Sequence, residues 1–179
     1  HKTIRWVVTV FLITVVISGI ISLVSDEVMD NSSLPVAFLI LLAIVMVGII
    51  FDIIGMAVAS ADEKPFHSMA ARKVPGSQEA IRLLRNAERV SSICNDVVGD
   101  ICGVVSGSAS ATIAALILTQ MDVGWPRGVS LVMSALVAGL TVGGKAIGKT
   151  FAVNSCTQIV HTVGRVLHAL NGLHGKKKK

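Results

Sequence analysis

Four long runs of apolar residues constrain this chain more than any other feature of its sequence. The first run, residues 6–24, carries no charged side chain and is long enough to cross the hydrocarbon core of a bilayer as a helix. Similar runs cover residues 35–61, 93–118 and 128–152. Because 53% of the 179 residues are hydrophobic, the chain has more apolar surface than a soluble core of this size can bury. The sequence therefore predicts an all-α integral membrane protein with four transmembrane helices in a single domain.

The first run has one alternative interpretation. Lys2 and Arg5 precede it, as basic residues do in a secretory signal peptide, but no convincing small-residue cleavage site follows. We therefore expect an anchor helix that stays in the protein rather than a cleaved signal.

Basic residues indicate how the predicted spans are oriented. The connections 25–34 and 119–127 contain Arg127 as their only Lys or Arg, whereas the segment 62–92 is rich in both. By the positive-inside rule, this segment and both termini face the cytoplasm, and we expect the cell membrane as the location. The basic residues of the segment are Lys64, Arg72, Lys73, Arg82, Arg85 and Arg89.

Two amphipathic helices are predicted outside the spans. One covers residues 77–90 within the cytoplasmic hairpin 62–92, and the other is a juxtamembrane helix over residues 156–173. Helices of this kind lie in the headgroup plane. The alternatives are a helix that faces a protein partner and, for the final lysines, a tail that is not native. The residues expected to contact anionic lipid are Arg165, Lys176, Lys177, Lys178 and Lys179.

Polar and ionisable residues inside the predicted spans are the candidates for function. Asp52 lies near the end of the second span, and Asn95, Asp96 and Asp100 lie in the third. An ionised Asp at the bilayer centre costs about 2.5–3.5 kcal/mol on insertion scales. Three carboxylates with only Lys145 of the fourth span at a similar depth leave an excess of negative charge. A bound cation or a proton has to balance that charge.

Carboxylate and amide oxygens suit Mg²⁺ or Na⁺ better than they suit soft metals. The predicted metal ligands are therefore Asp52, Asn95, Asp96 and Asp100, with Lys145 as an internal counter-cation. Asp96 and Asp100 are four residues apart and share one face of a helix. The alternative is a structural ion pair between Lys145 and one of these two carboxylates, with Asp52 close to the membrane interface.

Four stretches of the sequence match the pattern of a known family. They are the end of the second span, "GMAVASA", the hairpin sequence "AIRLLRNAERV", the polar entry "SICNDVVGDICG" and the ending "GGKAIGKTFAVNSCTQIV". Over residues 36–160 the chain resembles the transmembrane domain of the CorB/CorC (cyclin M) magnesium transporters. The resemblance implies a dimeric domain that binds dehydrated Mg²⁺ within the membrane and exports it, with Na⁺ as the exchanged ion.

The sequence departs from the family pattern in three respects. Gly55 and Met56 stand where the family has a Ser-x-Ser-Glu region of oxygen ligands, and Lys145 stands where it has Glu. The regulatory CBS pair of the family is not among these 179 residues. The leading hypothesis is a divergent, homodimeric Mg²⁺ transporter. The runner-up is a non-transporting membrane scaffold or regulator in which Lys145 occupies the cation position.

No enzymatic activity is expected. "IIFDII" and "VVGDIC" resemble the paired Asp motifs of intramembrane aspartyl proteases, but Val97 replaces the first glycine of G-x-G-D. The sequence contains no G-x-S-x-G, P-loop or HExxH motif. Its three cysteines form no CxxC pair and are expected to be free thiols. We expect no nucleic-acid partner.

Overall fold

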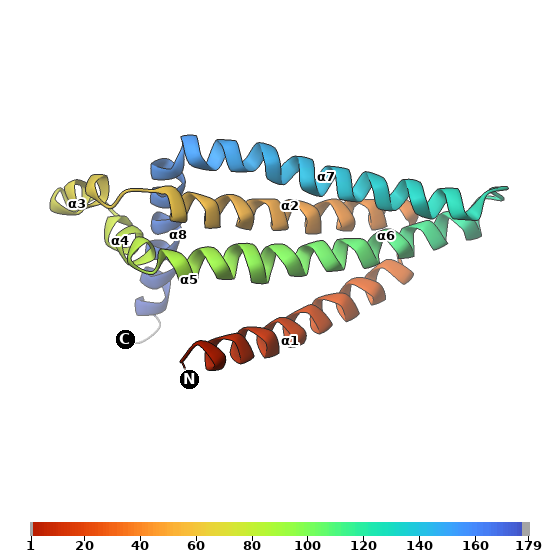
Figure 1. Ribbon diagram of the computed structural model, residues 1–179, viewed down its shortest axis with the longest axis horizontal. Coiled ribbons are helices and arrows are strands. Elements are labelled where there is room, and N and C mark those ends of the chain that lie inside the picture. The colour runs from red at the N-terminus through yellow and green to blue at the C-terminus, as the bar shows by residue number, and fades with distance from the viewer. Residues whose placement is uncertain (1, 177–179) are drawn as a thin grey trace. The chain divides into compact units, whose positions relative to one another are not determined.

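The computed structural model describes residues 2–176, and every regular element in that range is a helix (Figure 1). This confirms the predicted all-α fold. Four helical segments are long and apolar enough to cross a membrane, which confirms the four predicted spans at the level of length and composition. They are α1 (Lys2–Asp30), α2 (Leu34–Ser60), the continuous run of α5 (Ala87–Ser92), η1 (Ile93–Gly99) and α6 (Asp100–Gln120), and α7 (Pro126–Asn154).

The long helices extend past most of the apolar runs that predicted them. α1 continues to Asp30 although its apolar run ends at residue 24, and the third helix begins at Ala87 rather than at residue 93. Hydropathy marks the part of a helix that lipid can cover, whereas the backbone hydrogen bonds continue for as long as no residue breaks them. Pro126 starts α7, because proline tolerates the first helical turn, where its missing N–H costs nothing.

Three shorter helices lie outside the four spans: α3 (Lys64–Ala71), α4 (Ser77–Arg85) and α8 (Cys156–Lys176). Between α3 and α4 the backbone takes a left-handed turn, with φ of 56° at Lys73 and 84° at Gly76. Glycine adopts such a conformation without steric cost, so Gly76 is suited to the point where the chain enters α4.

The prediction of a single amphipathic helix over residues 77–90 was wrong. The helix ends at Arg85, and Asn86 leaves the helical conformation with φ of −114° and ψ of 28°. The side-chain amide of Asn86 donates a hydrogen bond to the carbonyl oxygen of Arg82 at 3.0 Å. Asparagine often competes with the backbone in this way, which explains the break. Residues 87–92 therefore belong to the third long helix and not to the hairpin.

The chain divides into two compact units. We call the one made of His1–Ile49 and Val97–Lys145 the span unit, and the one made of Ile50–Asp96 and Ala146–Lys179 the hairpin unit. The helices α2 and α7 and the third long helix contribute residues to both units.

In the span unit, α1 packs against α6 through a small apolar core. Val97, Ile101 and Val105 are buried, and Val10 and Ile44 pack against them. Most of α1 remains uncovered, however, and none of its most apolar window is buried. Phe11, for example, is 64% exposed. Soluble proteins rarely expose so large an apolar surface, so lipid is the environment that this helix requires.

In the hairpin unit, Phe66 of α3 is the largest fully buried side chain. It lies in a core to which α2, α4, α7 and α8 each contribute small or branched residues. This core ties the short helices to the ends of two spans. Its other buried members are Ala57, Val58, Ala80, Leu84, Ala152 and Val160.

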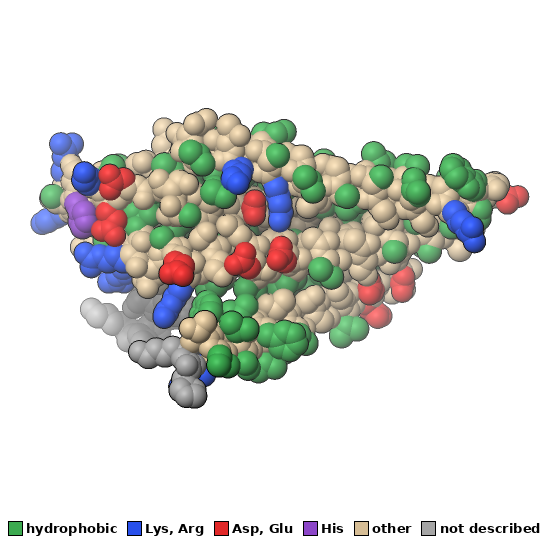
Figure 2. Space-filling view, in the orientation of Figure 1, with side chains coloured by type: hydrophobic (Ala, Val, Ile, Leu, Met, Phe, Trp, Pro, Cys, Tyr) green, Lys and Arg blue, Asp and Glu red, His purple; other side chains and the backbone are tan. Residues whose placement is uncertain are grey.

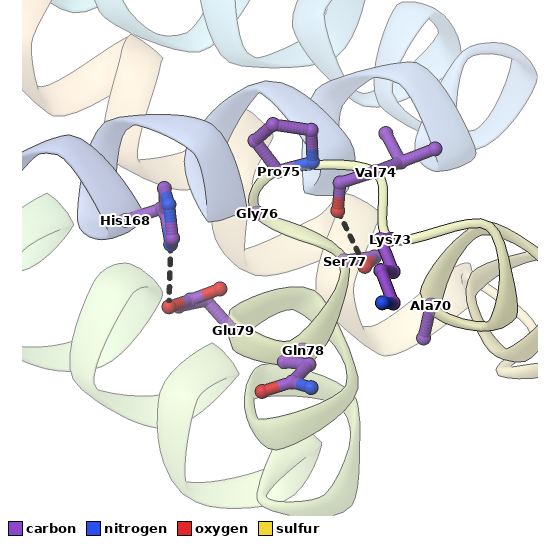
Figure 3. A pocket seen from close by; sticks show the side chains of 9 residues that line it. All are labelled: Ala70, Lys73, Val74, Pro75, Gly76, Ser77, Gln78, Glu79 and His168. Atoms are coloured by element: carbon purple, nitrogen blue, oxygen red, sulfur yellow. Dashed lines mark hydrogen bonds and ion pairs between the residues drawn. The ribbon is translucent and has the colours of Figure 1, made fainter.

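The helices α4 and α8 meet at two glycines. A Cβ atom added to Gly164 of α8 would overlap the carbonyl oxygen of Gly76 and lie 3.1 Å from the backbone nitrogen of Ala80. Beside this contact, His168 Nδ1 lies 3.0 Å from Glu79 Oε1, and Figure 3 shows the two side chains pointing toward one another from α8 and α4. A cavity of about 260 Å³ lies next to the pair, with Lys73 in its wall.

The glycine contact predicts a strong effect of a single methyl group. Gly164→Ala is expected to destabilise the protein by about 1–3 kcal/mol, because backbone atoms rather than a flexible side chain occupy the space. Thermal unfolding of the purified protein in detergent measures the effect. The matched control is Gly172→Ala on the same helix, where nothing lies within 4 Å. The control is expected to be neutral or stabilising, and equal destabilisation of both variants would contradict the contact.

The Glu79–His168 pair predicts a pH-dependent stability. The hydrogen bond with His168 holds the pKa of Glu79 below its ordinary value. A carboxylate with a lowered pKa stabilises the fold above about pH 4.5, and this stabilisation disappears as the pH falls through the folded-state pKa. Because His168 is largely exposed, the pair is worth only about 0.2–1 kcal/mol.

We therefore expect Glu79→Gln to lower the melting temperature at pH 7, by an amount that shrinks as the pH falls below about 4.5. Melting curves recorded between pH 3 and pH 7 (about the range over which carboxylates titrate) provide the measurement. Glu88→Gln, at an exposed position of α5, is the control and is expected to show no such trend. A Glu79→Gln deficit that stays constant across this range would refute the assignment.

Candidate functional site

The five candidate site residues are divided between the two units. Asp52, Asn95 and Asp96 belong to the hairpin unit, and Asp100 and Lys145 belong to the span unit. Asp52 and Lys145 are partly buried on α2 and α7, whereas Asp96 and Asp100 are exposed. Figure 2 shows acidic side chains on the exposed surface over α5 and α6. These carboxylates are therefore accessible to a partner or an ion from outside their own helix.

Asn95 and Asp96 lie in a π-helical segment, Ile93–Gly99. The sequence predicts an ordinary α-helix there, so this is a correction to the expected geometry. A π-helix closes its hydrogen bonds five residues along the chain instead of four, which is unfavourable and usually occurs as a short bulge at a functional site. The segment therefore places two of the candidate ligands where the backbone geometry is unusual.

The side-chain carbonyl of Asn95 is buried without a partner. Its Nδ2 donates a hydrogen bond to Ser91 Oγ at 3.3 Å, but its Oδ1 has no hydrogen-bond partner among residues 2–176. Leaving a buried acceptor unsatisfied costs about 1–3 kcal/mol. A water, a proton donor or a cation that reached this oxygen would remove that cost.

The space for Asn95 Oδ1 comes from Gly55 of α2. A Cβ atom at Gly55 would overlap Oδ1 and lie 3.0 Å from the Cβ of Cys94. Asp52 precedes Gly55 by three residues and so lies on the same face of α2. The position at which the sequence departs from the CorB/CorC pattern is therefore the position that lets the Asn95 amide approach α2.

Asp96 is held by a hydroxyl group on its own helix. Ser92 Oγ donates a hydrogen bond to Asp96 Oδ2 at 2.8 Å. Such a hydrogen bond orients a carboxylate and fixes the direction in which it can offer its oxygens to an ion. Asp96 and Asn95 therefore each have a serine partner one turn earlier, Ser92 and Ser91.

The two serines were not among the predicted site residues. Each stands four residues before its partner, the spacing at which side chains on a helix meet, so the sequence contained a usable signal. The role of Gly55 had no such signal, because it depends on how α2 packs against η1.

Carboxylates alone do not form a metal cage here. Among the described residues, no group of three or more His, Cys, Asp or Glu side chains could hold a metal ion. A cation site in this chain therefore requires amide, hydroxyl, backbone or water oxygens, or side chains from a second copy.

Asp100, Lys145 and the basic residues of α8 are the remaining candidates. Asp100 is the first residue of α6, and Lys145 lies in α7, next to Gly144, which has Ile49 of α2 against it. Arg165 is exposed on α8. Lys176 is the last described residue of that helix, and Lys177, Lys178 and Lys179 lie outside the described residues.

The three cysteines are free, as predicted. Cys94 is buried beside Gly55 of α2. Cys102 lies against Gly48, which also belongs to α2. Neither belongs to a group that could hold a metal within residues 2–176. Within its own unit, each of these two thiols therefore acts as an apolar packing group.

Comparison with known proteins yields no match. No family model matches the chain, and no curated protein or solved structure matches it. The resemblance to the CorB/CorC magnesium transporters stays a prediction from the sequence.

The unpartnered carbonyl of Asn95 predicts an unusual stability effect. Asn95→Leu removes a buried acceptor that has no partner within the described chain, so the protein is expected to keep or gain stability, by up to about 1–2 kcal/mol. Ser91→Ala is the opposite control, because it removes the acceptor for Asn95 Nδ2 and is expected to destabilise. Thermal unfolding without added metal measures both variants. A large loss of stability in Asn95→Leu would show that the amide has a structural role instead.

Proposed function

We propose that this chain is a CorB/CorC-like divalent-cation transporter that binds Mg²⁺, as its transported ion, with oxygen ligands inside the membrane. The observation that carries the proposal is the buried Asn95 Oδ1, which has no partner among residues 2–176 and lies beside Asp96 in a π-helical segment. A buried acceptor without a partner requires an explanation, and a bound ion or an ordered water supplies one.

The ligand types suit a hard cation. Asn95 offers a neutral oxygen toward α2, and Asp52 offers a carboxylate on the face of α2 that contains Gly55. Asp96 is exposed, so its negative oxygen would join them through bound water or from a second copy of the chain. Mg²⁺ accepts ligands of this type, and Na⁺ is the alternative that the same oxygens also fit. Asp100 stays a predicted ligand on the neighbouring turn of the helix.

The distribution of charge supports an orientation with both termini in the cytoplasm. The connections Asn31–Ser33 and 121–125 contain no Lys or Arg, whereas α3, α4 and the turn between them contain five. The positive-inside rule then places the hairpin helices on the cytoplasmic side of the cell membrane. The five basic residues are Lys64, Arg72, Lys73, Arg82 and Arg85.

The exposed carboxylates also favour a homodimer. Asp96 and Asp100 are exposed along a helix whose length is that of a transmembrane span. A charged side chain that faces hydrocarbon is costly, so these groups require a polar surface of a second copy or a water-filled space. A dimer that covers this helix face meets that requirement.

We infer that the helix α8 contacts lipid headgroups. Ser155 alone separates it from α7, and in Figure 1 it runs across the end of α7 instead of continuing it. Its predicted apolar stripe is split, because Val160 packs into the hairpin unit while other apolar side chains stay exposed. With Arg165 and the final lysines, that exposed ridge suits an anionic membrane surface. The ridge consists of Val166, Leu170 and Leu173.

A Mg²⁺ titration of the purified protein by calorimetry tests the proposal. We expect saturable binding to the wild type and a loss of affinity of about ten- to a hundredfold in Asp96→Asn and in Asn95→Leu, because the first removes a negative charge and the second removes an oxygen ligand. Gly55→Ala is expected to weaken binding as well, since its methyl group would displace the Asn95 amide. Glu88→Gln leaves the ligands intact and is the control. Equal binding in all variants, or none in any, would sink the proposal.

Lys145→Met separates transport from the scaffold alternative. If Lys145 is a counter-cation that an arriving ion displaces, the variant is expected to bind Mg²⁺ more tightly. If Lys145 permanently replaces the cation, the variant instead loses stability, because the negative carboxylates lose the positively charged partner that Lys145 provides. Mg²⁺ flux into proteoliposomes with an entrapped indicator dye provides the functional readout.

A further inference from the structure

The span unit contains a cavity within its membrane-spanning helices that the proposed ion site does not use. Its volume is about 220 Å³, and one wall comes from α6 while the other comes from α7. Several of its lining residues are exposed, so the cavity is open on one side. The residues that line it are Gly103, Ser106, Gly107, Ser110, Ser134, Val137, Ala138, Thr141 and Val142.

Four hydroxyl groups distinguish this cavity from an ordinary packing defect. Ser106 and Ser110 of α6 are only 1% and 2% exposed, and their hydroxyls donate to the carbonyl oxygens of Gly103 and Gly107 at 2.9 and 2.8 Å. These bonds engage the hydroxyl protons and leave oxygen lone pairs available. The other two hydroxyls belong to Ser134 and Thr141 of α7, so polar groups come from both walls.

Thr141 supplies a second, independent observation. Its Oγ1 atom is buried and has no hydrogen-bond partner in the part of the chain that the structure describes. A hydroxyl group in hydrocarbon without a partner is costly, and in membrane proteins ordered water commonly satisfies such groups. The cavity exceeds by a wide margin the roughly 30 Å³ that one water occupies, and the hydroxyls of its two walls are the polar part of a lining that is otherwise mostly apolar.

On both helices, a residue that lines the cavity is within about one turn of a charged residue on the same face. Gly103 and Gly107 follow Asp100 by three and seven residues, so all three lie on one face of α6. On the antiparallel α7, Thr141 precedes Lys145 by four residues and shares its face. One end of the hydroxyl-lined wall on each helix therefore leads, within one turn, to an ionisable side chain.

We propose that this cavity is a water-filled vestibule through which a hydrated cation travels to and from the level of Asp100. The inference rests on the proposed transport function and extends it by naming the path. Hydroxyl and carbonyl oxygens replace part of the hydration shell of a moving ion, and because they are neutral they do not trap it. The ligands of the vestibule are water and a small hydrated cation.

Cysteine accessibility tests the vestibule without measuring transport. In a background that lacks Cys94, Cys102 and Cys156, we expect Ser134→Cys and Thr141→Cys to react with a positively charged methanethiosulfonate at least about tenfold faster than Leu136→Cys, because only a hydrated thiol ionises readily. Leu136 lies on the same helix in an apolar environment and is the matched control. Rates equal to the control would overturn the inference. Spontaneous disulfide dimers of Ser134→Cys without reagent labelling would overturn it too, since they indicate a dry contact between copies.

A second pair of variants tests the path in function. Ala138 lines the cavity, whereas Ala135 lies on the same helix and does not. Ala138→Leu is expected to reduce Mg²⁺ flux in proteoliposomes at least about tenfold while Mg²⁺ affinity stays unchanged, and Ala135→Leu is expected to do neither. Unchanged flux in Ala138→Leu would count against the vestibule.

The two experiments keep this inference separate from the proposed function. If the wild type shows no Mg²⁺ binding or flux but the cysteines react as expected, the transport proposal fails and the water-filled cavity stands. If Mg²⁺ is transported and the cysteines are unreactive, the ion uses another path and the vestibule is wrong.

Discussion

The structure depends on how polar groups are accommodated in helices that lipid has to cover. Placing an ionised Asp inside a span costs free energy, and apolar neighbours do not offset that cost. A cation, a proton, water or a polar group of the protein has to stabilise the carboxylate. The same requirement applies to the Asn95 carbonyl, which is neutral and still costly when nothing donates to it. The surroundings of Asn95 and Asp96 reflect this requirement. Ser91 and Ser92 lie one turn earlier on the same helix, Gly55 lies opposite Asn95, and the backbone of both residues is π-helical.

Hydropathy was sufficient to predict the all-α architecture and the four long helices, because a membrane-spanning helix needs about twenty apolar residues and little else in a sequence imitates that. It could not predict where those helices end. Residues 87–92 and 25–30 are polar enough to read as hairpin or loop, yet they continue helices whose apolar portions are already formed. The break at Asn86 was equally invisible to periodicity, since Ile81, Leu84, Ala87 and Val90 keep a helical spacing across it.

Tertiary contacts account for what the sequence could not supply at the candidate site. The sequence shows that Asp96 and Asp100 are four residues apart. It contains no local residue preference that predicts the π-helical segment to which Asp96 belongs. The meeting of Gly55 with Asn95 joins two spans, and the pairing of Glu79 with His168 joins positions 89 residues apart. His168 belongs to the predicted juxtamembrane helix, and it forms a hydrogen bond with Glu79 of α4 because α8 lies against that helix.

The polar groups of the third long helix change in kind along its length. Carboxylate and amide groups lie on its π-helical segment and the next residue, and farther along α6 only hydroxyls and glycines face the cavity. A path made of carboxylates throughout would hold a divalent ion too tightly to release it, and a wholly apolar path would not admit the ion. Under the proposed transport function, charged ligands at one level followed by neutral oxygens would combine strong binding with release. This gradient also limits the insertion cost, because a serine hydroxyl bonded to its own helix backbone, as Ser106 is, enters lipid far more cheaply than an ionised Asp.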